Sequence, residues 1–379
     1  MHLRQSYPHL FLAVITLVLL SASFAYAQGP TAGPPSTTIE NHVCLACHSN
    51  PTLTLTFLTG EVLSAYIDPA QYNASVHGKV GQRCTTCHAD ITAYPHPTVQ
   101  ARDSRDYSLQ MYTVCKQCHA HVYAQALDSI HSKHLAAGNR NAAVCTDCHT
   151  AHYVFNPHQP RARISQTCRM CHSIIYDQYA QSVHGAALLD ESNPDVPTCV
   201  DCHGVHQIVD ARTAAFRLKS PQMCASCHTD AARMRRYNLS TNVLNTYVAD
   251  FHGTTVALFE KQSPDAPTNV AVCYDCHGIH DIRSTKDPQT GIIKKENLLK
   301  VCQQCHPDAT LDFPSSWMSH YDASPTRYSI VYYVNLFYTI LIPLVIGSML
   351  GFVVLDAARH IKERREKSTP PSESEAQDE

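Results

Sequence analysis

The sequence predicts a mostly helical protein with little regular secondary structure and one C-terminal transmembrane helix. Three observations predict this fold class. A Cys-x-x-Cys-His motif recurs nine times and uses all 18 cysteines of the 379-residue chain. Leu, Ile and Val are thinly spread between the two ends, so something other than aliphatic side chains must fill the interior. Residues 329–355 contain no charged side chain.

The first 27 residues are predicted to be a secretory signal peptide. Arg4 supplies positive charge, residues 10–20 form an apolar run, and Ala25-Tyr26-Ala27 is a small-x-small cleavage site. An uncleaved anchor is the alternative, although the apolar run is short for a membrane span. Either way, the body of the protein is expected to be exported, to a compartment where disulfides could form. Residues 28–41 are rich in Pro, Gly and Thr and are expected to form a linker.

Residues 328–356 are predicted to form the transmembrane helix, because a helix of this length reaches about 40 Å. Tyrosines at its outer end suit the membrane interface, and the G-x-x-x-G at 347–351 would let another helix approach closely, unless the two glycines are a chance pair. Five basic residues follow the inner end: Arg359, Lys362, Arg364, Arg365 and Lys367. The positive-inside rule therefore places the C-terminus, with a basic segment and a disordered acidic tail over 357–379, in the cytoplasm.

The nine motifs follow one another over residues 44–306. Their residues are Cys44, Cys47, His48; Cys84, Cys87, His88; Cys115, Cys118, His119; Cys145, Cys148, His149; Cys168, Cys171, His172; Cys199, Cys202, His203; Cys224, Cys227, His228; Cys273, Cys276, His277; and Cys302, Cys305, His306. This spacing is the attachment signature of c-type haem, in which two sulfurs bond the porphyrin vinyl groups and the histidine binds the iron. Zinc sites and a disulfide framework are the alternatives, but neither requires the histidine that follows every pair. The sequence therefore predicts nine covalently bound haem c groups.

A longer repeat surrounds the motifs. Residues 118–131 and 171–184 align without a gap, and both are expected to form short helices that end in Ser-x-His. Similar ends occur at 75–77, 250–252 and 318–320. His152, His206 and His280 each lie three residues beyond a motif histidine, giving His-x-x-His. Residues 42–327 thus divide into four two-haem modules and a truncated fifth.

This arrangement resembles the multihaem c-type cytochromes of the doubled Cys-x-x-Cys-His kind, which include periplasmic donors of nitrite reductase and decahaem conduits of metal-respiring bacteria. The resemblance covers nearly all of the exported region. It implies a haem-packed protein whose irons take two axial ligands. A single C-terminal anchor is not typical of those soluble donors, and the resemblance therefore does not identify the redox partner.

The 25 histidines are enough to supply two ligands for every iron. Besides the nine motif histidines, the predicted distal ligands are His77, His96, His131, His152, His184, His206, His252, His280 and His320. His96 departs from the pattern, because it lies eight residues past His88. His42 could replace His96, and His134, one helical turn beyond, could replace His131. We expect distal histidines to be donated to neighbouring modules and to tie the haems together.

Two histidines on an iron leave no open position for substrate, so the sequence favours electron transfer over catalysis and predicts no catalytic residue. The expected role lies in anaerobic respiration, between the quinone pool or an integral membrane cytochrome subunit and a soluble or outer-surface partner, in either direction. A reductase of nitrite, hydroxylamine or sulfur oxyanions with one open haem is the alternative, so whether the chain is an enzyme stays open. A packing or filament-forming cytochrome is a third possibility. The net charge of −3 argues against nucleic acid as a partner.

The haem groups are expected to form most of the core, with short helices, long ligating loops and little sheet. The one strand candidate is residues 53–66, where a hairpin should turn at Thr59-Gly60.

Overall fold

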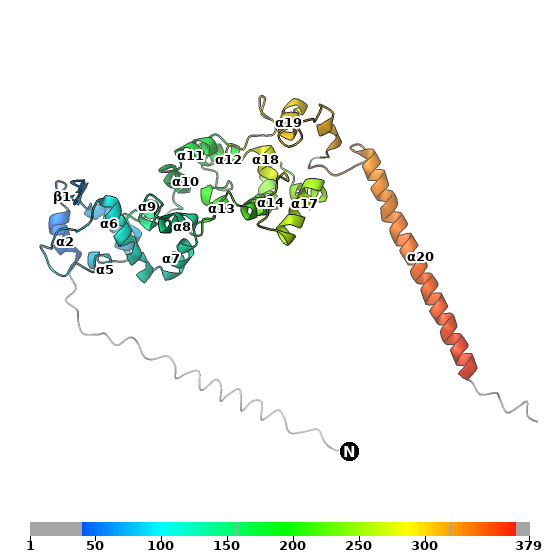
Figure 1. Cartoon of the computed structure of the whole chain (residues 1–379), viewed down its shortest axis with the longest axis horizontal. Helices are drawn as coiled ribbons and strands as arrows, with labels where there is room; N and C mark the ends of the chain where they lie inside the picture. The colour runs from blue at the N-terminus through cyan, green and yellow to red at the C-terminus, as the bar shows by residue number, and fades with distance from the viewer. Residues whose placement is uncertain (1–39, 157, 319, 369–379) are drawn as a thin grey trace, which may run out of the picture. The chain divides into compact units, whose positions relative to one another are not determined.

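The computed structural model describes residues 40–156, 158–318 and 320–368. The predicted signal peptide, most of the predicted linker and residues 369–379 lie outside the described residues. The fold is mostly helical with little sheet, which confirms the predicted class (Figure 1). The chain divides into two compact units, one of residues 40–123 and 135–156 and the other of residues 124–134 and 158–368. The boundary falls within two helices, α7 (Ala120–Leu127) and α8 (Ile130–Ala136).

The first unit consists of short helices and one hairpin. Its elements are α2 (Asn41–His48), β1 (Thr54–Thr56), β2 (Val62–Ser64), α3 (Pro69–Ala74), α4 (Val76–Lys79), α5 (Cys84–Cys87), α6 (Ser104–Met111), the 3₁₀ helix η1 (Tyr112–Gln117) and α9 (Cys145–His149). Strands β1 and β2 pair antiparallel, with Leu55 opposite Leu63. Gly60 takes a φ of 85° at the turn, a left-handed conformation that glycine adopts without strain, so the predicted hairpin is confirmed.

The second unit also consists of short helices, apart from α14, α17 and the long helix at its end. Its elements are α10 (Ala162–Arg169), α11 (Ser173–Ala180), α12 (Val183–Leu189), α13 (Cys199–His203), α14 (Ala214–His228), α15 (Ala231–Met234), η2 (Arg235–Tyr237), α16 (Val243–Ala249), α17 (Phe251–Gln262), α18 (Cys273–His277), α19 (Lys295–Cys302), η3 (Phe313–Ser316) and α20 (Ser329–Ser368). Helix α14 packs against α16, α17 and α18.

The polypeptide buries few apolar side chains of its own. Only thirteen hydrophobic residues are buried among the described residues, and three of them, Leu218, Val256 and Val272, form a cluster. Large apolar side chains such as Ile174 and Phe251 are instead more than two-thirds exposed. A chain of this size normally buries a much larger apolar core. These side chains are therefore available to pack against an apolar group that is not polypeptide.

Helix α20 differs from every other element. It is one continuous helix of 40 residues, drawn in orange and red in Figure 1, and it passes through Pro343 without a break. The segment Ser329–Arg365 is long and apolar enough to cross a membrane, because its most apolar 18-residue stretch has a mean hydropathy of 2.3 and is not buried in the protein. No other helix in the described part of the chain meets these criteria. Length and composition thus support single-pass anchoring.

The repeat helices differ from the sequence expectation in one respect. Each predicted single helix is broken into two, α7 and α8 in one repeat and α11 and α12 in the other. The break falls at the serine of Ser-x-His, because its side chain favours the N-cap position. The Ser182 hydroxyl, for example, accepts a hydrogen bond from the Gly185 N–H at 3.0 Å and so starts α12.

Candidate haem-binding sites

The second motif of modules two, three and four lies on a short helix that an aspartate fixes. In α9, α13 and α18 the residue before the second cysteine is Asp147, Asp201 or Asp275. Each carboxylate accepts a hydrogen bond from the backbone N–H just before the motif, at 2.6–2.7 Å. This contact satisfies a donor that the start of a helix leaves unpaired, and it explains why five residues hold a helix here.

An arginine from the same module binds each of these aspartates. The pairs in modules two, three and four are Arg105–Asp147 at 2.8 Å, Arg161–Asp201 at 2.7 Å and Arg217–Asp275 at 2.6 Å. Each guanidinium also donates to a backbone carbonyl of the segment that leads into the motif. We call this arrangement the Arg–Asp clamp. It joins the segment before the first motif of a module to its second motif.

The first module has no such aspartate and uses Asn41 instead. The side-chain oxygen Oδ1 of Asn41 accepts a hydrogen bond from the Cys84 N–H at 2.9 Å. The side-chain Nδ2 of Asn41 donates to the Gln82 carbonyl at 3.1 Å. Sequence reasoning missed both devices. An aspartate recurs in the three motifs that carry His-x-x-His and in no other motif, and this pattern was a signal that could have revealed the clamp.

Four predicted distal histidines begin short helices. His77, His131, His184 and His252 are each the second residue of α4, α8, α12 or α17. The residue after three of them is glycine, and a Cβ at Gly78, Gly185 or Gly253 would lie 1.9–2.1 Å from a carbonyl oxygen of the preceding helix. Glycine is therefore required for the two helices to meet closely, and this packing fixes where the histidine ring points.

Each of the first three modules is hydrogen-bonded to the next through the residue inside Ser-x-His. Its N–H donates to the carbonyl two residues beyond the closing histidine of the following module. The pairs are Val76 to Val154 at 2.8 Å, Ile130 to Ile208 at 2.7 Å and Val183 to Ile282 at 2.9 Å. These bonds bring the distal histidines of one module beside the motifs of another.

The structure pairs predicted distal histidines with motif histidines. Among the described residues, eight such ring pairs are present: His48–His96, His77–His119, His88–His152, His131–His172, His184–His228, His203–His280, His252–His306 and His277–His320. Ring centroids lie 6.0–6.4 Å apart in every pair. Every pair joins histidines of different modules except His48–His96.

This separation fits a metal ion between two imidazoles. Bonds of about 2.0 Å from each nitrogen to the metal, with about 1.1 Å from nitrogen to ring centre, give about 6.2 Å between the rings. Rings in direct contact would be closer, and a zinc site would need further ligands. No cluster of three or more His, Cys, Asp or Glu suited to a metal occurs in the part of the chain that the structure describes. The pairs fit two axial positions of a haem iron.

Several of the paired rings make a hydrogen bond through Nδ1 that fixes the orientation of the ring. The Nδ1 atoms of His48 and His96 face the carbonyls of Ala65 and Pro97 at 2.8 and 2.9 Å. Such a contact is donated by the Nδ1 proton and leaves the Nε2 lone pair for a metal. The His252 ring instead faces the Asp250 carboxylate at 3.2 Å.

Burial keeps many of these rings neutral. It lowers the pKa of His152 and His184 to about 4, and a neighbouring histidine in each case adds to the effect. Burial also lowers the pKa of His88, His203, His228, His277, His280 and His320. A neutral imidazole is the form that binds a metal.

The cysteines of neighbouring motifs lie close together. All 18 are free thiols, and in seven of the motifs the second cysteine is more exposed than the first. The first thiols of the two motifs in a module lie within hydrogen-bonding reach of each other: Cys44 and Cys84, Cys115 and Cys145, Cys168 and Cys199, and Cys224 and Cys273. Two attachment sites of one module therefore lie side by side.

Successive modules are close at their second thiols. Cys87 lies close enough to Cys115 and Cys118 for electrostatic interaction between the thiols. The same holds for Cys202 beside Cys224 and for Cys276 beside Cys302. Within each unit, the attachment sites thus follow one another in sequence order.

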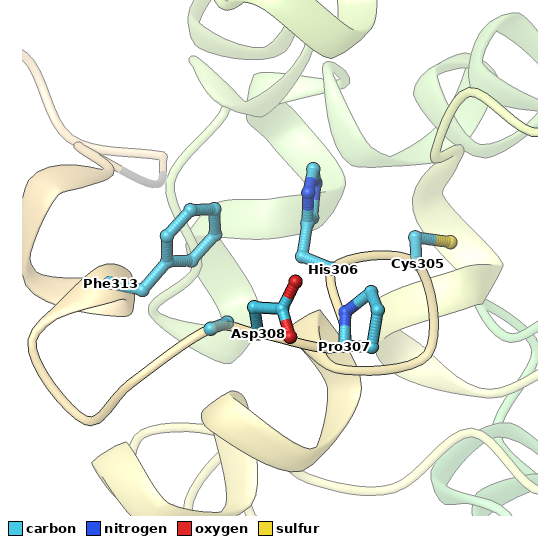
Figure 2. A pocket seen from close by; sticks show the side chains of 6 residues that line it. Cys305, His306, Pro307, Asp308 and Phe313 are labelled. Carbon is cyan, nitrogen blue, oxygen red and sulfur yellow. The ribbon is translucent and has the colours of Figure 1, made fainter.

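The last motif borders an open hollow of about 290 Å³. Figure 2 shows the His306 ring between Phe313 and Cys305, with Asp308 on the loop below. The Phe313 ring lies 5.1 Å from the His306 ring. This hollow gives an apolar group room beside a motif histidine.

The structure also decides between histidines that the sequence left open. His131 rather than His134 faces His172, and His96 rather than His42 faces His48. His320, grouped by sequence with the Ser-x-His ends, faces His277 and so occupies the place of a closing histidine. His149 lies at the end of α9 in the first unit, and His206 lies after α13 in the second. Their roles as ligands stay predictions.

One family description fits this geometry. The model of the cytochrome c3 family matches residues 138–229, which hold the fourth to seventh motifs. The match supports a multihaem c-type cytochrome with covalently bound haem c and a role in electron transfer. No curated protein matches the chain.

Proposed function

We propose that the chain is a membrane-anchored nonahaem cytochrome c that conducts electrons between the membrane and acceptors or donors outside the cytoplasm. Each Cys-x-x-Cys-His motif would attach one haem, and its histidine would be the proximal ligand. The nine distal ligands would be His77, His96, His131, His152, His184, His206, His252, His280 and His320. Haem iron held in this way supplies one-electron oxidation and reduction.

One observation carries this proposal. Eight motif histidines face a predicted distal histidine across the gap that a metal ion between two imidazoles requires. With both axial positions filled by the protein, substrate has no iron to bind, and ligand geometry changes little on reduction. The arrangement therefore favours electron transfer over a reductase with an open haem.

The close thiols support a conducting row. Alternate contacts through first and second cysteines keep neighbouring attachment sites adjacent, from the first to the fourth motif in one unit and from the fifth to the ninth in the other. The exposed apolar side chains also support the proposal, because porphyrins packed against them would supply the apolar core that the polypeptide lacks.

The C-terminal helix supports entry or exit of electrons at the membrane. Tyr328 directly precedes α20, and its hydroxyl donates a hydrogen bond to the Trp317 carbonyl at 3.3 Å. The Trp317 ring lies 6.3 Å from the His320 ring. The last sites are thus joined directly to the anchor. Quinol or an integral membrane cytochrome subunit would be the partner there, and a soluble or outer-surface protein the partner elsewhere. The haem region would lie in the periplasm and the C-terminus in the cytoplasm.

Haem content and spin state test this proposal together. The detergent-solubilised protein should carry nine haems by intact mass, and low-temperature EPR of its oxidised form should show only low-spin iron. Integration of the high-spin and low-spin ferric signals gives the count. A stoichiometric high-spin signal would contradict the conduit and support the reductase alternative. Fewer than nine haems would contradict the attachment sites.

A further inference from the structure

The fourth module differs from the others at the residue that starts its distal helix. Modules one to three have Ser75, Ser129 and Ser182 at this position, and module four has Asp250. The serine hydroxyls accept hydrogen bonds from backbone N–H groups of the helices that they begin, at 3.0–3.2 Å. Asp250 does this work with one carboxylate oxygen, which accepts from the Phe251 N–H at 2.6 Å.

The other oxygen of Asp250 is available for a second partner. It lies 3.2 Å from the His252 Nδ1 and accepts a 2.6 Å hydrogen bond from the indole N–H of Trp317. The carboxylate is largely shielded from solvent, with a side-chain exposure of 19%. Trp317 therefore holds the negative charge against the ring of a proposed iron ligand.

A carboxylate at this position acts differently from the neutral partners of other rings. His48 and His96 face backbone carbonyls, and His320 faces the Thr246 hydroxyl at 3.4 Å. A carboxylate that accepts the Nδ1 proton makes an imidazole a stronger electron donor and stabilises the more positive charge of ferric iron. The iron becomes harder to reduce as a result.

We propose that Asp250 sets the reduction potential of the site between His252 and His306, holding it below the value that a serine would give. This inference rests on the proposed function. Asp250 is a positioning residue, since it acts through His252. The Trp317 ring that donates to Asp250 also lies 6.3 Å from the His320 ring. The same charge should therefore affect the site between His277 and His320 more weakly. Electrons that arrive at the ninth site would move downhill into the row.

Asp250→Ser and Asp250→Asn test this in the full-length, haem-loaded protein. Serine restores the helix start used by the other modules, and asparagine keeps the shape without the charge. In a redox titration followed by visible absorption and EPR, both variants should shift one of nine one-electron components to higher potential. A second component should shift less. The number of haems and their low-spin state should stay unchanged.

Asp68→Ser is the matched control. Asp68 also starts a helix, α3. Its carboxylate accepts hydrogen bonds from the Ala70 and Gln71 N–H groups and from the Gln71 side chain, and among the described residues it contacts no histidine ring. It should leave all nine potentials unchanged. Unchanged potentials in both Asp250 variants, or an equal shift in the control, would overturn the inference. Loss of a haem or a new high-spin signal in both variants would make Asp250 structural and would also overturn it. Failure of the proposed function itself would appear in the unmodified protein.

Discussion

The eight ring pairs fall into two groups that differ in where the distal histidine lies. In the helix-borne pairs it is the second residue of a short helix, and in the loop-borne pairs it lies in irregular chain. The helix-borne pairs, His77–His119, His131–His172, His184–His228 and His252–His306, have ring planes 35–61° apart. The loop-borne pairs, His48–His96, His88–His152, His203–His280 and His277–His320, have planes only 4–25° apart.

The difference shows how backbone structure controls ring orientation. A capped helix start and a closely packed glycine fix the direction in which a side chain leaves the helix. Irregular chain has more freedom, and the ring can align with its partner. The third, fifth, seventh and ninth motifs face helix-borne histidines, and the first, second, sixth and eighth face loop-borne ones. The two groups therefore alternate from the fifth motif to the ninth, and neighbouring sites there should differ in electronic structure.

The largest expected effect is visible in the unmodified protein. Parallel imidazole planes donate into the same iron d orbital and separate its energy from that of the second, whereas crossed planes donate into both. EPR of the oxidised protein should therefore show two groups of low-spin signals in comparable amounts, one with markedly larger g anisotropy. A single uniform signal would remove the distinction between the groups.

Removing one distal histidine should change one haem in nine. His131→Ala takes away the ring opposite His172, so one iron should become high-spin and the more anisotropic group should lose one haem. His134→Ala, on the same helix α8, is the control and should leave the spectrum unchanged. EPR integration measures both. Equal spectra of the two variants would show that α8 does not supply the ligand through His131.

The close helix contact should tolerate no added carbon. Gly185→Ala would place a Cβ 1.9 Å from the Tyr179 carbonyl oxygen, so we expect a loss of about 1–3 kcal/mol in the free energy of unfolding. Gly347→Ala in α20, where a Cβ meets nothing within 4 Å, should change that free energy by less than about 0.5 kcal/mol. Denaturant titration followed by haem absorbance compares them. Similar stabilities would mean that α11 and α12 can separate freely.

Breaking the Arg–Asp clamp should lower the free energy of unfolding by less than the Gly185→Ala substitution does. Arg217→Gln breaks the pair with Asp275, in which both side chains are about three-quarters buried, and should cost about 1–2 kcal/mol of unfolding free energy. Arg212 is 79% exposed in its pair with Asp210, and Arg212→Gln should leave the free energy of unfolding almost unchanged. The same titration distinguishes them. An equal cost would show that the clamp is an ordinary surface ion pair.

Part of this architecture could be predicted from sequence because its chemistry is local. A haem that bonds Cys199, Cys202 and His203 needs them within five residues, so the motif is complete in the sequence. The hairpin at Gly60 and the apolar helix α20 are likewise local, and both are present. The split of the repeat helices was missed because a capping serine outweighed a helical pattern of spacing.

Sequence alone predicts where haems would attach, and it shows that histidines are numerous enough to be distal ligands and that one segment is apolar enough to span a membrane. Which histidine faces which depends on tertiary packing. His88 meets His152 and His203 meets His280, and no local pattern specifies contacts across such distances along the chain. Hydrogen bonds between modules, as from Val183 to Ile282, bring them together. Ring angles, the Arg–Asp clamp and the bond from Trp317 that holds the Asp250 carboxylate depend on that packing, because they join side chains that lie far apart in the sequence.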